Sequence, residues 1–354
     1  MGKASLLLGT GKGAFTLSQV RGGWDVTGPL VDTSPINHAI ADPVTGHLHA
    51  AGGGWFGHGV WRSTDDGDSW SCINEGIALP DEEVTGVWSL ARSHGRLYAG
   101  TKPAALFSSD DDGLSWSPVT GLNHHETRSE WCAGGAGMVL HHIVVHPKDQ
   151  NRLWVGISVA GVFATEDGGD TWEPRNAGTR VEFGDVEPSY PEFGQCVHSL
   201  ARAGGPLDVL YQQNHCGMYR SPDGGRNWTS IEAGLPSSFG FPVAVHPRDA
   251  DCVWLFPLNG DVQGRFAPGG RPAIWRTRDA GASWQRLDRG LPERHAYFTV
   301  LRQAMAVEPK TGESLYFGTN TGEVWGSDDA GDNWRCIARH LPPILSVEVH
   351  SSVL

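Results

Sequence analysis

Short apolar runs recur along the whole chain in groups of three, and polar or glycine-containing stretches separate them. These runs are rich in β-branched and aromatic residues and are only a few residues long, which is typical of strands rather than helices. Clear examples are His142–Val145, Leu153–Gly156 and Gly161–Phe163, and then His198–Ala201, Val209–Tyr211 and Met218–Arg220. The pattern predicts an all-β protein built from repeated groups of strands.

A polar motif, Ser/Thr-x-Asp-x-Gly-x-x-Trp, follows each group and recurs about every 50 residues. In this motif the aspartate can accept hydrogen bonds from turn amides, and the glycine can adopt a positive φ. The tryptophan then begins a fourth strand with a large packing surface. The motif occurs six times, with its aspartates at Asp65, Asp111, Asp167, Asp223, Asp279 and Asp329.

These motifs resemble the Asp-box, or bacterial neuraminidase repeat, of sialidases, sortilin-type receptors and some glucanases. The resemblance implies a β-propeller in which the boxes lie on the face opposite the ligand site and have a structural role. It also implies a possible glycosidase. However, the Phe/Tyr-Arg-Ile-Pro segment that supplies the first arginine of sialidases is absent, and few arginines precede Arg128.

Six boxes define six units of four strands, which is the size of a propeller blade. The strand-like segment at 344–354 has no blade of its own, and 4–27 resembles a blade without its first strand. Joining them predicts a single seven-bladed β-propeller over 1–354, with the ring closed by pairing of the C-terminal strand with the N-terminal blade. The other six blades are expected at approximately 35–72, 85–118, 139–174, 196–230, 241–286 and 301–336.

Composition agrees with short strands and tight turns, since the 354 residues include 48 Gly, 22 Pro and 15 Trp. The net charge of −13 argues against nucleic acid and anionic membranes as partners and leaves a small-molecule substrate. The six cysteines form no CxxC pair, and the N-terminal run of three leucines is too short for a signal peptide. We therefore expect a cytoplasmic protein; the sequence leaves its oligomeric state open.

Aligning the first strands by eye places three histidines, His38, His142 and His198, at one position. His215 follows a second strand and is expected on the same face. Four imidazoles near the axis would suit a divalent transition metal, Zn, Fe, Cu or Ni, with an open coordination position. A polar site without metal and purely structural histidines are the alternatives.

Long loops at 118–138, 174–195, 258–272 and 286–303 are expected on that face, and such insertions usually carry function. Glu130, Glu182 or Glu192 could act as general base. Arg265, Arg294 or Arg302 could bind an anionic group.

The leading hypothesis is therefore a metal-dependent enzyme that acts on a small polar or anionic substrate, as a hydrolase more readily than as an oxygenase. A sialidase-like or other glycoside hydrolase without metal is the second hypothesis. The third is a binding or assembly scaffold without chemistry.

Overall fold

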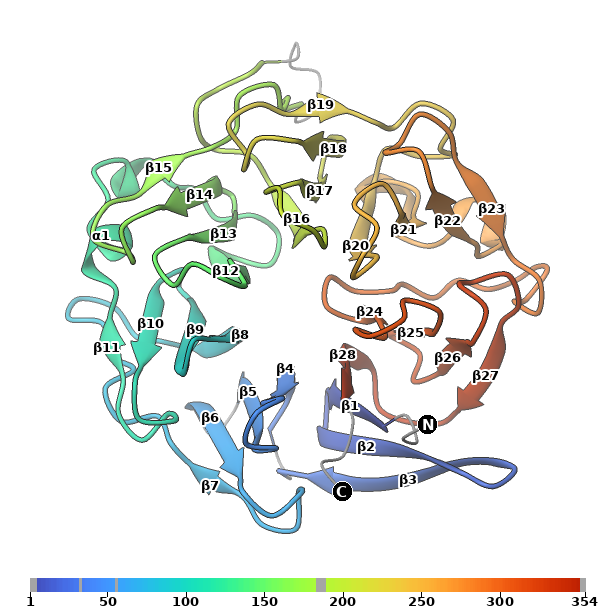
Figure 1. Ribbon diagram of the computed structural model, residues 1–354, viewed down its shortest axis with the longest axis horizontal. Coiled ribbons are helices and arrows are strands. Elements are labelled where there is room, and N and C mark those ends of the chain that lie inside the picture. The colour runs from blue at the N-terminus through green and yellow to red at the C-terminus, as the bar shows by residue number, and fades with distance from the viewer. Residues whose placement is uncertain (1–4, 32–33, 55–56, 183–188, 351–354) are drawn as a thin grey trace. The chain divides into compact units, whose positions relative to one another are not determined.

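The computed structural model describes residues 5–31, 34–54, 57–182, 189–350 of the chain. It consists of seven four-stranded sheets (Figure 1). The contacts divide the chain into two compact units, one comprising 1–174 with 350–354 and the other 175–349.

The first unit contains the strands of the four N-terminal sheets. The first sheet has β1 (Ser5–Thr10), β2 (Gly13–Val20) and β3 (Gly23–Leu30). The second has β4 (Ile36–Ala41), β5 (Leu48–Gly54), β6 (Gly57–Ser63) and β7 (Ser71–Cys72). The third has β8 (Gly86–Ser93), β9 (Arg96–Lys102), β10 (Leu106–Ser109) and β11 (Ser117–Pro118). The fourth has β12 (Val139–Val145), β13 (Leu153–Ser158), β14 (Gly161–Thr165) and β15 (Glu173–Pro174).

The second unit contains three complete sheets. The fifth sheet has β16 (Val197–Arg202), β17 (Leu210–Asn214), β18 (Gly217–Ser221) and β19 (Thr229–Ser230). The sixth has β20 (Gly240–Val245), β21 (Val253–Pro257), β22 (Ile274–Thr277) and β23 (Gln285–Leu287). The seventh has β24 (Met305–Val307), β25 (Leu315–Gly318), β26 (Val324–Ser327) and β27 (Arg335–Ala338).

The C-terminal strand β28 (Ile344–His350) completes the first sheet, whose strand order is β28-β1-β2-β3. The chain is thus an all-β, seven-bladed propeller with four-stranded blades, and the predicted pairing of the C-terminal strand with the N-terminal blade is confirmed. The remaining strands follow the chain order within each blade, as the repeat predicts.

Each Asp-box forms the same hydrogen-bonded turn between the third and fourth strands of its blade. In the fifth blade, Asp223 Oδ1 accepts bonds from Ser221 Oγ at 2.7 Å and from the Asn227 amide at 3.0 Å. The Gly225 amide, at a φ of 87°, donates to Ser221 Oγ at 2.8 Å. Trp228 Nε1 donates to the Arg175 carbonyl at 2.8 Å and joins the turn to the preceding connection. The Asp-box carboxylates accept hydrogen bonds within their own turns, which supports a structural role for the boxes.

Apolar side chains from neighbouring sheets pack together and form the core between blades. In the first unit, one cluster packs Val87 and Leu97 of the third blade against Val60 of the second. In the second unit, Tyr211 and Met218 of the fifth blade pack with Val253 and Leu255 of the sixth. Within the described part of the chain, no helix is long and apolar enough to cross a lipid bilayer.

The long loops contain short helical turns that the sequence pattern did not predict. The loop at 118–138 contains α1 (Thr120–Asn123) and the 3-10 helix η1 (Arg128–Glu130). The loop at 258–272 contains η2 (Asp261–Gln263) and η3 (Pro268–Gly270). These turns bury part of each connection, for example Leu122 and Gly270.

Bulges in the first strands correct the predicted alignment of the histidines. In β16, Val197 and Ser199 face consecutive residues of β17, so His198 is the extra residue of a bulge. The corresponding extra residues are Asn37 in β4 and His141 in β12. His38 and His142 each come one residue after the extra residue. The prediction that His38, His142 and His198 share one position is therefore wrong. All three strands have a bulge at the equivalent place, and His198 aligns with Asn37 and His141 rather than with His38 and His142.

Candidate functional site

The candidate site lies within the second unit, at the edge where the first strands of its blades begin. Val197, at the start of β16, pairs with Asn214, at the end of β17, so the residues just outside both strands meet there. In the sixth blade, Gly240 and Pro257 pair at the matching edge, and the loop with Asp261 and Arg265 follows. Arg302 comes shortly before β24 of the seventh blade. Three consecutive blades thus contribute polar side chains to one edge.

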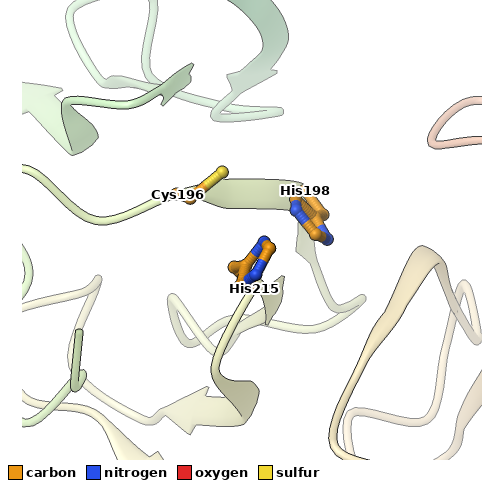
Figure 2. Close-up of side chains that lie close together, drawn as sticks. All are labelled: Cys196, His198 and His215. Atoms are coloured by element: carbon orange, nitrogen blue, oxygen red, sulfur yellow. The ribbon is translucent and has the colours of Figure 1, made fainter. Parts of the chain in front are cut away.

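Cys196, His198 and His215 form a compact group at this edge (Figure 2). One potential ligand atom from each residue lies within 4.8 Å of those of the other two. The two imidazole rings are 5.3 Å apart and nearly perpendicular, and the His215 amide donates to the Cys196 carbonyl at 2.9 Å. A thiolate and two imidazoles are a ligand set that Zn or Cu accepts, so the group meets the composition of a metal site.

His198 is held in one orientation by the next blade. Its side chain is buried, and its Nδ1 donates to the Gly240 carbonyl oxygen at 2.7 Å. Burial and the positive charge of Arg302 lower the pKa of His198 well below its ordinary value. Burial likewise lowers the pKa of His215, with Arg265 and Arg302 adding to the effect and Asp261 opposing it. Both rings are therefore neutral at physiological pH, with Nδ1 of His198 as the donor.

Two arginines and two phenylalanines enclose the histidines. The guanidinium of Arg302 lies 4.8 Å from the centre of the Phe241 ring, and that of Arg265 lies 5.9 Å from the same ring. Phe239 packs edge-on against His198 and His215, with ring centres 5.1 and 5.2 Å away. Arg265 Nε donates to Asp261 Oδ1 at 2.5 Å, and Asp261 Oδ2 is 3.8 Å from His215 Nε2. The guanidinium charges oppose a metal cation in this cluster and favour an anion.

A second group of charged residues lies close to Cys216, the residue that directly follows His215 of the cluster. The Cys216 thiol donates to the Glu182 carbonyl oxygen at 3.3 Å. Arg180 contacts two carboxylates, Glu182 at 3.1 Å and Glu232 at 3.0 Å. Together with Asp261, these residues place carboxylates beside the imidazole cluster.

The predicted site residues divide into those that meet in the second unit and those that lie elsewhere. The structure brings together His198, His215, Arg265 and Arg302, with Glu182 at the border. Glu192 is exposed, and its backbone oxygen accepts a bond from Asn176 Nδ2. Arg294 is exposed in a separate hollow with Arg271 and Asp288.

His38, His142 and Glu130 belong to the first unit. His38 Nδ1 accepts a bond from the Leu90 amide at 2.9 Å, and burial lowers the pKa of His38 to about 4. His142 Nδ1 is 2.8 Å from Nδ1 of His141. Glu130 is exposed at the end of η1. The predicted four-histidine metal site remains a prediction, and the group observed in the second unit has Cys196 with His198 and His215.

Sequence reasoning missed Cys196 and gave no role to Phe239 and Phe241. Cys196 lies two residues before His198, and alternate residues of a strand share a face, so that spacing was an available indication. The phenylalanines gave no such indication, because an apolar residue at a strand start is ordinary core material.

Comparison with known proteins connects the propeller to xyloglucanases. No family model matches the chain. It is 26% identical over 224 residues to the oligoxyloglucan-reducing end-specific xyloglucanase of Emericella nidulans, which covers 53% of this chain and 25% of that enzyme. A probable enzyme of the same name from Neosartorya fischeri is 24% identical over 223 residues. The chain spans about a quarter of the length of these curated relatives.

Solved structures show the same fold at low sequence identity. The GH74 xyloglucanase from Xanthomonas campestris superposes with a TM-score of 0.69 at 18% identity, covering 96% of this chain and 53% of that one. Ycf48 from Cyanidioschyzon merolae gives 0.57 at 14% identity and covers 87% and 86% of the two chains. The chain is therefore a seven-bladed propeller that is similar in sequence, over about half of its length, to an oligoxyloglucan-reducing end-specific xyloglucanase. It shares its fold with a GH74 xyloglucanase and with Ycf48.

Proposed function

We propose that this propeller is a glycoside hydrolase whose site is the cluster at the edge of the fifth and sixth blades. The observation that carries the proposal is the similarity over 224 residues to an oligoxyloglucan-reducing end-specific xyloglucanase. The site adds chemical support, because glycoside hydrolysis uses two carboxyl groups on either side of the scissile bond. Asp261 Oδ2 is 3.8 Å from His215 Nε2, and Glu182 contacts the neighbouring Cys216 through its backbone, with its carboxylate paired to Arg180. We assign Asp261 and Glu182 as the two carboxyl groups.

The surroundings suit a sugar substrate. Phe239 and Phe241 are buried and form the apolar backing of the cluster, and the neutral imidazoles and the guanidiniums supply hydrogen-bonding groups in front of it. Binding sites for small molecules typically combine aromatic walls with a few placed polar groups.

Hydrolysis of xyloglucan oligosaccharides by the purified chain tests the proposal, with release of reducing ends as the measurement. We expect Asp261→Asn and Glu182→Gln each to lower the rate by at least about a hundredfold. Glu313→Gln changes an exposed carboxylate away from the cluster and is the matched control. A wild-type protein that neither cleaves nor binds these oligosaccharides would contradict the proposal.

A metal-dependent hydrolase is the second candidate, supported by the close approach of Cys196, His198 and His215. A bound ion would activate water beside Asp261. Metal analysis of protein purified without a histidine tag is the test. We expect about one ion per chain, lost in Cys196→Ser and retained in Cys72→Ser, which alters an exposed cysteine. Metal-free wild-type protein that also fails to take up added Zn would exclude this candidate.

A further inference from the structure

The outer strand of the N-terminal blade differs from the outer strands of the other six blades. β3 has eight residues, whereas β7, β11, β15 and β19 have two each, β23 has three and β27 has four. It is the last strand in the order β28-β1-β2-β3, and no described strand pairs with its outer edge (Figure 1). The N-terminal blade therefore presents by far the longest outer edge of the seven described sheets.

The turn that leads into β3 explains its length. The other six blades enter their fourth strand through an Asp-box, and in the fifth blade the strands on either side of the box pair over two residues only. In the N-terminal blade a two-residue loop, Arg21-Gly22, connects Val20 to Gly23, and pairing with β2 continues from there to Leu30. Gly22 has a φ of 90°, which glycine adopts without strain. The long edge is thus a property of the one blade that has no Asp-box.

The middle of this edge is suited to accept a further strand. Six of the eight residues of β3 are exposed, and Val26 at its centre is 42% exposed. Natural proteins usually protect outer edges with short strands, charges or proline. β3 has one charged residue, Asp25, and its proline, Pro29, lies near the end of the strand. Alternate residues of an outer strand direct N–H and C=O groups away from the sheet, so the stretch around Val26 is a template for strand addition.

We propose that the β3 strands of two copies of this chain pair antiparallel across a two-fold axis and form a dimer. Directly opposed residues of an antiparallel pair share a face of the sheet, so the axis must pass through a residue position. An axis at Val26 places the two Val26 side chains opposite each other and Asp25 opposite Thr27 of the second copy. Both contacts are favourable, one as a β-branched pair and one as a carboxylate beside a hydroxyl donor. An axis at Asp25 would oppose two carboxylates, which is unfavourable.

A second copy is the occupant that the charges of this edge select. Asp25 is the only charged residue of β3, and the two-fold pairing places it beside a hydroxyl and away from its own copy. The net charge of −13 on each chain opposes association, and pairing of two edges buries little surface. We therefore expect a weak dimer that salt strengthens, because salt screens the repulsion between the chains. The dimer does not depend on the proposed hydrolase, so either can fail while the other stands.

Sedimentation equilibrium over about 5 to 500 μM protein, at low and at high salt, measures the association. We expect a monomer–dimer equilibrium whose dissociation constant is at least about threefold lower at high salt. Val26→Lys opposes two like charges at the axis and should weaken the dimer at least about tenfold. Val20→Lys is the matched control, because Val20 is 41% exposed in the same hairpin but belongs to β2. A wild-type chain that stays monomeric, oligomers larger than a dimer, or equal losses in both variants would overturn the proposal.

Disulfide cross-linking tests the register directly. Opposed residues of an antiparallel pair have Cα atoms close enough for a disulfide, so two Val26→Cys chains should cross-link at the axis under mild oxidation. The exposed Cys72 and Cys132 are first changed to serine, which removes competing thiols. Val20→Cys in the same background is the control and should remain uncross-linked. A chain that dimerises without cross-linking through Val26→Cys, or that cross-links equally through Val20→Cys, would refute pairing about Val26.

Discussion

His198 donates a hydrogen bond from Nδ1 to the carbonyl oxygen of Gly240 at 2.7 Å, and this bond joins the first strands of the fifth and sixth blades. Replacing His198 with alanine removes the donor and leaves a buried carbonyl without it. We expect the unfolding free energy to fall by about 1–3 kcal/mol. Chemical denaturation followed by tryptophan fluorescence measures the change. His215→Ala is the control; its ring is 24% exposed and should cost less. Equal losses in both variants would contradict this account.

His38 should make the protein sensitive to mild acid. Burial lowers its pKa from 6.5 to about 4, and its Nδ1 accepts the Leu90 amide, which a protonated ring cannot do. Between these two values the unfolded state binds more protons, so the stability that His38 contributes is present above pH 6.5 and is lost as pH falls toward 4. Each unit of the shift corresponds to about 1.4 kcal/mol.

The test of this expectation compares wild type with His38→Gln, since glutamine can accept the same amide without titrating. We expect the loss of unfolding free energy between pH 7.5 and pH 4.5 to be smaller in the variant by about 2 kcal/mol. Parallel stability curves for the two proteins would show that His38 does not titrate as inferred.

The Asp-box aspartates should affect stability and leave ligand binding intact. Burial opposes ionisation of Asp223, but bonds from Asn227 and Ser221 hold the pKa of its carboxyl below the ordinary value. Asp223→Ala removes the acceptor for the Asn227 amide and side chain and is expected to cost about 1–3 kcal/mol. Thermal denaturation and binding of xyloglucan oligosaccharides would check both halves. Weakened binding in a fully folded variant would place the box in the site and contradict its structural role.

Glu348 in β28 should destabilise the protein at neutral and alkaline pH. Burial raises the pKa of its carboxyl from 4.5 to about 7, so the folded state binds more protons than the unfolded state. The contribution to stability is therefore present below pH 4.5 and is lost as pH rises through 7. Glu348→Gln should raise the unfolding free energy at pH 8 by about 1–3 kcal/mol and change little at pH 4. A variant that is less stable at pH 8 would reverse this conclusion.

The repeat in the sequence was enough to predict the fold because each turn is encoded locally. Residues such as Ser221, Asp223 and Gly225 bond within four positions of one another, so the same local motif forms the same turn in every blade. The tryptophans and short apolar runs then define four strands per blade, and the unpaired segments at the two ends predict the pairing of β28 with β1.

The candidate site could be predicted only in part. His198, His215, Arg265 and Arg302 were identified from polar residues at strand starts and in long loops, and the structure brings them together. The equivalence of His38, His142 and His198 failed, because the alignment by eye set β16 one residue out of register with β4 and β12, and only the strand pairing shows which residues correspond. Glu192 and Arg294 are equally polar loop residues, yet they lie away from the cluster.

The sequence by itself determined the number of blades, the place of each turn and the chemical types available near the strand starts. These depend on bonds between residues close in the chain. The tertiary structure alone decided that Cys196 joins His198 and His215, and that Arg302 stacks on Phe241 with an Nε that has no partner among the described residues. Those contacts depend on how three blades pack and on a bulge at His198, and both follow from interactions between residues far apart in the chain.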